Sequence, residues 1–303
     1  MARRFHTLDV FTKSPLTGNP LAVVRDCDGL DEAQMQAIAR EFNLSETVFL
    51  LSPCDPVNTA RARIFTPIRE LPFAGHPTIG AAVLIGLSEA QSFMRTQDIL
   101  IVIEEQVGPV ACTVGFDKQG VARARFTLPK LPETAGMAGE ILFIAQALGL
   151  AESDIGFGSH VPCIFSAGNP FCFVPVASLE AMARAKPDAS AWKAAFGQME
   201  RGACYLYTRE TVQSDHHFHA RAFAPGLGIH EDPATGSAVA AFAGVLMAQD
   251  KITDGSHVFV IEQGYEMGRP SLISLRLDVA EGKLMEASIG GSAVLVQDGT
   301  LNL

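Results

Sequence analysis

Apolar side chains fill two stretches of the chain almost without interruption, Thr78–Leu87 and Ala238–Met247. Neither stretch contains a charged residue. A helix that is apolar on every side has to be buried on every side, so we expect two helices that run through the interior of the fold. Each stretch follows a polar residue and a proline, which are His76-Pro77 and Asp232-Pro233. Because proline disfavours helical geometry in the residue before it, His76 and Asp232 are expected to be extended caps, with Asp232 as an N-cap.

Phe5–Phe11 alternates between apolar and polar positions, which is typical of a strand, and most of the further segments are also predicted to be strands. One exception is Asp31–Phe42, where apolar residues recur at helical spacing and predict a surface helix. Pro129–Gly139 holds two prolines and two glycines and is expected to be a linker. The clearest predicted strands are Phe5–Phe11, Glu46–Leu51, Ala62–Phe65, Leu100–Glu104, Ala111–Phe116 and Arg123–Leu128.

Four motifs of the first half recur in the same order in the second half, at offsets of 150 to 158 residues. The pairs are Thr17–Leu21 with Ala167–Phe171, Ala62–Pro67 with Ala220–Pro225, His76–Ala82 with Asp232–Ala238, and Glu104–Gln106 with Ile261–Gln263. The period is far too long for a solenoid. We therefore expect an α+β fold of two pseudo-symmetric domains, each a mostly antiparallel sheet or barrel around its own apolar helix. The first covers residues 1–128, alone or completed by a C-terminal strand at about 288–303, and the second covers 129–287.

Composition limits the classes of molecule that this protein is expected to bind. The 303-residue chain is 48% hydrophobic, carries a formal net charge of −10 and has no run of Lys or Arg, which argues against nucleic acid and anionic membranes. No apolar stretch reaches about 18 residues, so we expect no membrane-spanning helix. Six scattered cysteines without a C-x-x-C pair are typical of free thiols in a reducing compartment, and we expect a cytoplasmic protein. A small carboxylate substrate stays compatible with this charge, because the free N–H groups at two helix starts can bind an anion.

Four polar residues are candidates for chemistry, and each also has an ordinary structural explanation. Glu46 precedes a predicted strand and could be a solvated loop carboxylate, but the matching stretch of the second half, Gly202–Tyr207, has no acid. The repeated fold therefore does not require an acid there. His76 and Asp232 could be simple helix caps, yet they hold equivalent places in the repeat and differ chemically. Capping alone would not require that difference. Ser237 could be present only because its small side chain lets the helix pack closely.

Other motifs are weaker. The run His216–His219 is rich in metal-binding side chains, but ligands in a row on one strand converge poorly on a tetrahedral ion. We interpret the run as a strand with exposed polar residues and expect no metal. The glycines Gly226 and Gly228 are not followed by the spacing of a dinucleotide-binding loop, and neither a P-loop nor a G-x-S-x-G elbow occurs.

Several motifs together resemble the phenazine-biosynthesis PhzF-like family, which belongs to the diaminopimelate-epimerase fold. They span most of the chain, and the last two are specific. The motifs are Asp9–Phe11 with Gly18–Pro20, Asn43–Thr47, Arg63–Pro67, Pro72–Thr78 and Glu231–Ala238. The resemblance implies two pseudo-symmetric halves with the active site between them, a homodimer, and a reaction without a cofactor.

The resemblance also assigns roles to residues. Glu46 is implied as the general acid/base, and His76, Asp232 and Ser237 as further polar residues of the pocket. Asn19, Gly75 and Gly236 are then candidate substrate contacts, the two glycines through backbone N–H groups. We expect His76 and Asp232 to face each other across the cleft, with Asp232 binding an amine or hydroxyl of the substrate or positioning His76.

The expected reaction is a proton shift on a small carboxylate substrate, which makes the protein an isomerase. Related epimerases and racemases use two cysteines, one at each helix start, whereas Pro72–Thr78 and Glu231–Ala238 contain none. The sequence thus argues against a two-thiol mechanism. Two alternatives stay open: another cofactor-free lyase or epimerase acting with the same residues, and a non-catalytic small-molecule-binding member of the fold.

Overall fold

The structure, a computed structural model, describes residues 2–90, 97–199 and 202–303 of the chain. The fold is a mixture of helices and strands, as the sequence predicted, and it divides into two units. Unit 1 comprises residues 1–129 and 290–303, and unit 2 comprises residues 130–289. Among the described residues, no helix is both long and apolar enough to cross a membrane.

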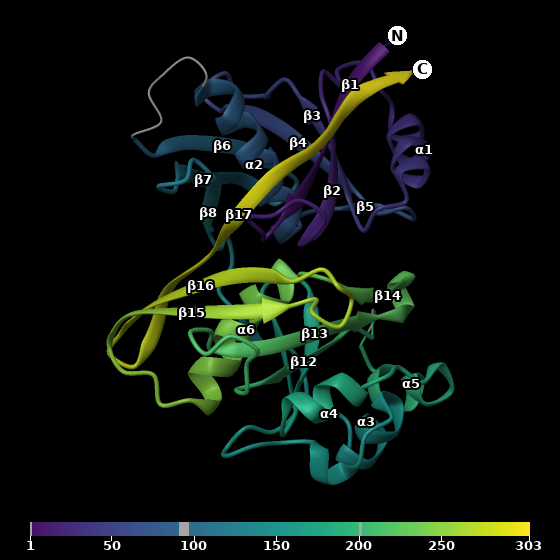
Figure 1. Ribbon diagram of the computed structural model, residues 1–303, viewed down its shortest axis with the longest axis vertical. Coiled ribbons are helices and arrows are strands. Elements are labelled where there is room, and N and C mark those ends of the chain that lie inside the picture. The colour runs from purple at the N-terminus through teal and green to yellow at the C-terminus, as the bar shows by residue number, and fades with distance from the viewer. Residues whose placement is uncertain (1, 91–96, 200–201) are drawn as a thin grey trace. The chain divides into compact units, whose positions relative to one another are not determined.

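Unit 1 is a closed barrel of eight strands, shown in Figure 1. Around the barrel the order is β1, β2, β3, β4, β6, β7, β8 and β17, and β17 also pairs with β1. Most neighbours are antiparallel, whereas β2–β3 and β4–β6 are parallel. The bounds are Ala2–Val10 for β1, Asn19–Val24 for β2, Thr47–Leu51 for β3, Ala60–Phe65 for β4, Glu70–Leu71 for β5, Ile99–Glu105 for β6, Gly108–Phe116 for β7, Ala122–Thr127 for β8 and Lys283–Asn302 for β17.

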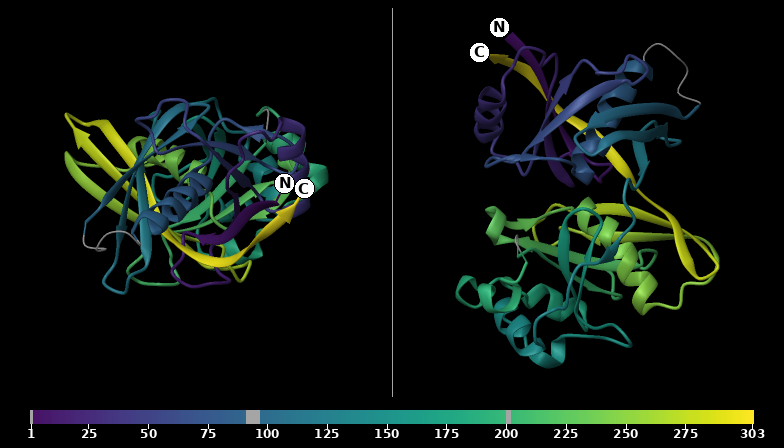
Figure 2. Two further views of the ribbon diagram at one scale, coloured as in Figure 1. Left: turned by 90° about the horizontal axis from the view of Figure 1, so that it is seen from above. Right: turned by 180° about the vertical axis from the view of Figure 1, so that it is seen from behind.

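The two ends of the chain meet in this barrel. Strand β1 pairs with β17 from Ala2 opposite Asn302 to Val10 opposite Ala293. Figure 2 accordingly shows both termini side by side. The last strand of the chain therefore completes the barrel that the first strand begins.

The central helix of unit 1 is α2, Gly75–Ala90. Its first half is buried on all sides, as its uninterrupted apolar sequence predicted. Gly80 allows close packing here, because a Cβ at this position would overlap Leu21 of β2 and lie 2.9 Å from Val10 of β1. On the outside of the barrel lies α1, Glu32–Phe42, which begins at a capping box formed by Asp31 and Gln34. The surface helix predicted at Asp31–Phe42 is thereby confirmed.

Unit 2 is built from a sheet in which the pairings run β9, β10, β11, β12, β13, β15 and β16, with β14 also on β13. The strand bounds are Glu133–Thr134 for β9, Cys163–Ser166 for β10, Pro170–Pro175 for β11, Cys204–Thr208 for β12, Phe218–Ala224 for β13, Ile229–Asp232 for β14, Gly255–Gln263 for β15 and Ser271–Ala280 for β16. Three helices, α3 (Ile141–Leu148), α4 (Leu179–Arg184) and α5 (Ala189–Phe196), build a second core on this sheet. Strand β9 lies within the predicted linker 129–139, so that stretch is partly ordered by pairing with β10.

The buried helix of unit 2 is α6, Gly236–Gln249. Its Phe242 contacts four aromatic rings from three strands, and ring centroids lie 4.8 to 6.1 Å apart. These rings belong to Phe173 of β11, Tyr205 and Tyr207 of β12, and Phe218 of β13. Aromatic packing on one helical residue therefore holds α6 against the sheet.

The strand register corrects one part of the predicted repeat. In unit 1, Ala60 of β4 pairs with Ile103 of β6, and in unit 2, Phe218 of β13 pairs with Ile261 of β15. Both members of the second pair lie 158 residues after those of the first. Glu105 is therefore equivalent to Gln263, whereas the sequence match at an offset of 157 had aligned Gln106 with it. Two adjacent glutamates in the first half made the one-residue slip possible.

Both helix starts differ from the predicted caps. Helix α2 begins at Gly75, so His76 is a helical residue and not an extended cap. Pro77 is tolerated there because first-turn N–H groups have no partner within the helix. Asp232 is the last residue of β14, and the N-cap of α6 is Thr235. The residues between them form a short connection, which displaces the helix start beyond Pro233.

Candidate active site

Three predicted site residues come together in unit 1. Asn19 begins β2, Glu46 directly precedes β3, and His76 lies in the first turn of α2. The Nδ2 atom of Asn19 lies 3.4 Å from Nδ1 of His76, and Oε2 of Glu46 lies 3.5 Å from Nε2 of His76. Both side chains of the Glu46–His76 pair are largely buried, with 13% and 5% exposed. The imidazole therefore lies between an amide and a carboxylate.

Burial decides the charge of the His76 ring. It lowers the pKa of His76 to about 3, because a charged imidazolium cannot be solvated there. The ring is thus neutral at physiological pH, with one nitrogen as donor and one as acceptor. Since the Asn19 amide nitrogen can only donate, Nδ1 of His76 is the acceptor and the ring hydrogen lies on Nε2. This hydrogen is on the side of Glu46.

Of the remaining predicted site residues, Gly75 begins α2 in unit 1, and Asp232, Gly236 and Ser237 lie at or just before the start of α6 in unit 2. Asp232 accepts a hydrogen bond from Thr235 Oγ1 at 2.6 Å, and its backbone carbonyl accepts from Gln263 Nε2 at 2.7 Å. Gly236 and Ser237 follow as the first two residues of α6. As in α2, the first N–H groups of this helix have no partner within the helix, which suits an anion.

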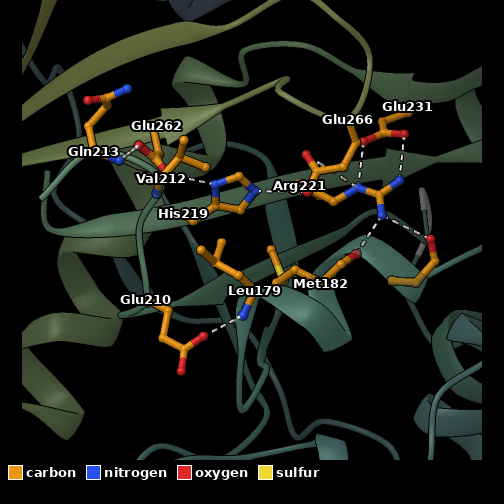
Figure 3. Close-up of polar contacts among 11 residues, drawn as sticks. Leu179, Met182, Glu210, Val212, Gln213, His219, Arg221, Glu231, Glu262 and Glu266 are labelled. Atoms are coloured by element: carbon orange, nitrogen blue, oxygen red, sulfur yellow. Dashed lines mark hydrogen bonds and ion pairs between the residues drawn. The ribbon is translucent and has the colours of Figure 1, made fainter.

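An ion pair supports the segment before each buried helix. In unit 1, Arg63 of β4 binds Glu70 of β5 through Nε at 2.6 Å and Nη2 at 2.5 Å. In unit 2, Arg221 of β13 binds Glu231 of β14 through Nε at 2.8 Å and Nη2 at 2.9 Å (Figure 3). Arg221 also donates to the backbone carbonyl of Met182. Sequence reasoning missed both pairs, although the arginines lie in a repeated motif that it had found.

The pair in unit 2 belongs to a larger buried network, shown in Figure 3. His219 lies between Glu262, at 2.8 Å from Nδ1, and Glu266, at 2.9 Å from Nε2. Burial alone would lower the pKa of His219, but the hydrogen bonds and charges of Glu262 and Glu266 outweigh it and raise the pKa to about 9. His219 is 1% exposed, so the prediction of exposed polar residues along His216–His219 is wrong for His219, whereas His217 is exposed as predicted. The sequence could not show that buried carboxylates of β15 and of the loop after it lie next to His219.

Neither helix start contains a cysteine. Among the described residues, no group of three or more His, Cys, Asp or Glu side chains could hold a metal ion. Burial raises the pKa of Cys27 and Cys172 to about 12, so these thiols stay protonated. The segments Pro72–Thr78 and Glu231–Ala238 contain no cysteine, and neither helix start therefore carries a nucleophilic thiolate.

Comparison with known proteins identifies the class of protein that carries this site. The family model PhzC-PhzF, described as phenazine biosynthesis-like protein, matches residues 8–299. The chain is 50% identical over 302 residues to an uncharacterized isomerase of Mesorhizobium japonicum, covering 99% of this chain and 98% of the relative. It is 34% identical over 296 residues to a trans-2,3-dihydro-3-hydroxyanthranilate isomerase of Pseudomonas chlororaphis, covering 98% of each. A solved structure of a PhzF-family phenazine biosynthesis protein from Bacillus anthracis matches with a TM-score of 0.88 and 28% identity, covering 100% of both chains.

The chain is thus an isomerase. It belongs to the PhzC-PhzF family, and the resemblance drawn from the sequence motifs is confirmed.

Proposed function

We propose that this isomerase moves a proton between two carbon atoms of a small carboxylate substrate without a cofactor, with Glu46 as the general acid and base. The observation that best supports this is the Glu46–His76 pair, in which a largely buried carboxylate lies 3.5 Å from a neutral imidazole. A carboxylate that water hardly reaches is a stronger base than a solvated one. A well-placed general base typically contributes about 10²–10⁴-fold to a rate.

His76 and Asn19 have supporting roles in this proposal. The Asn19 amide keeps Nδ1 of His76 as an acceptor, so Nε2–H is available to Glu46 or to the substrate. A neutral imidazole can donate this hydrogen to negative charge that develops on the substrate, or relay a proton, without first losing a positive charge. Glu46 removes the proton from an activated carbon and returns a proton to another carbon on the same face of the conjugated system.

The helix starts bind the substrate carboxylate. The N–H groups at Gly75 of α2 and at Gly236 and Ser237 of α6 offer donors and the positive ends of two helix dipoles. Asp232 binds an amine or hydroxyl of the substrate, which is small and anionic.

The relative from Pseudomonas chlororaphis provides a first compound for the test, trans-2,3-dihydro-3-hydroxyanthranilate. The experiment incubates the protein with this compound in D₂O and follows deuterium incorporation and isomerisation by NMR. We expect incorporation with the parent protein and a loss of at least about 10²-fold in Glu46→Gln. The matched control is Glu41→Gln, at an exposed position of α1.

Two results would count against the proposal. Undiminished deuterium incorporation in Glu46→Gln would exclude Glu46 as the base. Complete isomerisation without incorporation of solvent deuterium would mean that the transferred proton never exchanges with water. If the Glu46→Gln variant still catalysed isomerisation in this way, the proposed mechanism would be wrong.

A further inference from the structure

A second buried glutamate of unit 1, Glu105, has no part in the mechanism above. It is the last residue of β6 and is 8% exposed. Its Oε1 lies 2.6 Å from Oγ1 of Thr78, in the first turn of α2, and its Oε2 has no hydrogen-bond partner in the described part of the chain. The carboxyl group of Glu105 therefore contacts the same helix turn that carries His76.

The hydrogen atoms around Thr78 can be counted. The Thr78 hydroxyl oxygen lies 2.7 Å from the carbonyl oxygen of Ala74 and 2.6 Å from Oε1 of Glu105. A carbonyl oxygen can only accept, and the single hydroxyl hydrogen of Thr78 cannot serve both of these short contacts. When the hydroxyl donates to Ala74, the contact with Glu105 needs a hydrogen of its own. A protonated Glu105 supplies it, since a carboxylate has no hydrogen to donate.

The charges around Glu105 agree with a neutral acid. Glu105 lies close enough to Cys112 of β7 to raise the pKa of that thiol, which burial also raises, so Cys112 stays protonated and uncharged. Glu104 and its partner across the sheet, Arg61 of β4, lie on the opposite face of β6, because side chains alternate along a strand. Burial raises the pKa of Glu105 to about 8, while the bond with Thr78 acts in the opposite direction.

Charged residues line a cavity of about 490 Å³ next to Glu105, but each has other partners. Arg63 binds Glu70 and Glu32, and Arg61 donates to the sulfur of Cys54. Asp28 accepts hydrogen bonds from Ser52, and Glu104 accepts from the backbone N–H groups of Cys54 and Asp55 and from Asn58. The pKa of Glu105 is shifted by burial and by its bond with Thr78, and none of these charged groups contributes to the shift.

The equivalent position in unit 2 shows what such a residue does. Gln263 donates from Nε2 to the carbonyl of Asp232 at 2.7 Å and to Thr235 Oγ1 at 3.0 Å. Its Oε1 accepts from the N–H of Thr235 at 3.1 Å. A neutral amide thus holds the start of α6. A protonated carboxyl group is the closest chemical equivalent of an amide, because it also combines one donor side with one acceptor side.

We infer that Glu105 is a positioning residue for the proposed reaction: as a neutral acid it donates to Thr78, which in turn donates to Ala74, and this chain fixes the first turn of α2 with His76. Ionisation breaks the chain, because the Thr78 hydroxyl then has two acceptors and one hydrogen. This inference rests on the proposed function only where it concerns the rate. The protonation of Glu105 and the hydrogen-bond chain stand without it.

The first test is spectroscopic and needs no substrate. Infrared difference spectroscopy between the parent and Glu105→Gln, both in D₂O at pH 6, should show the carbonyl stretch of one buried protonated carboxylic acid, which the variant lacks. The band should disappear as the pH is raised through about 8. Absence of the band at pH 6 would overturn the inference, whatever the Glu46 experiments show.

The second test is the pH dependence of unfolding by urea. An unfolded glutamate ionises near 4.5, and Glu105 in the fold ionises near 8. A raised pKa in the fold means that stability is lost as the pH rises from 4.5 through 8. We expect the parent to lose stability in this window and Glu105→Gln to lose clearly less. Equal losses would overturn the inference.

The third test concerns the rate. Glu105→Leu removes the donor at similar size, and we expect kcat to fall about tenfold, the equivalent of one hydrogen bond. Glu105→Gln restores a donor and should recover most of this loss, and its kcat should no longer decline above pH 8 as that of the parent does. Thr78→Val should resemble Glu105→Leu, and Thr78→Ser should resemble the parent. A Glu105→Gln variant as slow as Glu105→Leu, with an unchanged pH profile, would contradict the positioning role.

Discussion

The imidazole of His76 lies 3.5 Å from the carboxylate of Glu46, yet burial keeps the ring uncharged. The two residues are therefore not an ion pair at physiological pH. They are a base and a neutral hydrogen-bond donor held side by side. This distinction has a measurable consequence for stability in acid.

His76 should make the fold sensitive to acid. An unfolded histidine takes up a proton near pH 6.5, whereas His76 in the fold does so only near pH 3. A lowered pKa in the fold means that stability is lost as the pH falls from 6.5 through 3. Between pH 7 and 4.5 we expect the parent to lose about 3 kcal/mol more than His76→Asn, measured by urea unfolding.

The control for His76 is His230→Asn, because His230 is exposed. This variant should lose as much stability in acid as the parent. If His76→Asn also follows the parent, His76 is accessible to protons in the folded state, and the neutral-donor role becomes untenable.

His219 predicts the opposite dependence on pH in unit 2. Its pKa in the fold is about 9, so its contribution is fully present below pH 6.5 and is lost as the pH rises through 9. His219→Asn removes the cation that Glu262 and Glu266 share, and leaves Glu266 with Arg221, 4.0 Å away, and Glu262 with its hydrogen bond to His216. We expect a loss of about 3–5 kcal/mol at pH 7, the usual cost of breaking a buried ion pair. The difference between variant and parent should shrink at pH 10, which urea unfolding at both pH values can check.

The two equivalent ion pairs should differ in their importance. Arg221 is buried, whereas the side chain of Arg63 is 25% exposed and has Glu32 as a second partner. Glu231→Gln should therefore cost about 3–5 kcal/mol, because it leaves a buried guanidinium with only Glu266, 4.0 Å away, as its counter-charge. Glu70→Gln should cost only about 1 kcal/mol. Equal costs in urea unfolding would show that the surroundings of the two arginines do not determine their energetics.

Gly80 should not tolerate a methyl group. Alanine is the better helix former by about 1 kcal/mol, but its Cβ would overlap Leu21. We expect Gly80→Ala to destabilise the protein by about 1–3 kcal/mol through overpacking. Glu41→Ala, at an exposed position of α1, should change stability by less than about 0.5 kcal/mol. A stabilised Gly80→Ala would mean that the barrel can move away from α2.

Much of the fold could be predicted because it depends on local pattern. An apolar run such as Ala238–Met247 leaves burial as the only stable outcome for a helix. The helix at Asp31–Phe42 was predictable from the helical spacing of its apolar residues. The repeat was visible because equivalent backbone positions impose similar requirements on both halves. Glu46 and His76 could be named as candidates for the same reason, by their difference from the second half.

Tertiary structure decided what depends on residues far apart in the chain. Strand register made Glu105 the equivalent of Gln263, and a one-residue slip in the sequence match had concealed it. Burial made His76 neutral and, together with Glu262 and Glu266, made His219 charged. The identity of a side chain determines which charges it can carry. Which charge it does carry depends on how much water and which partners the fold leaves around it, and no local pattern in the sequence records that.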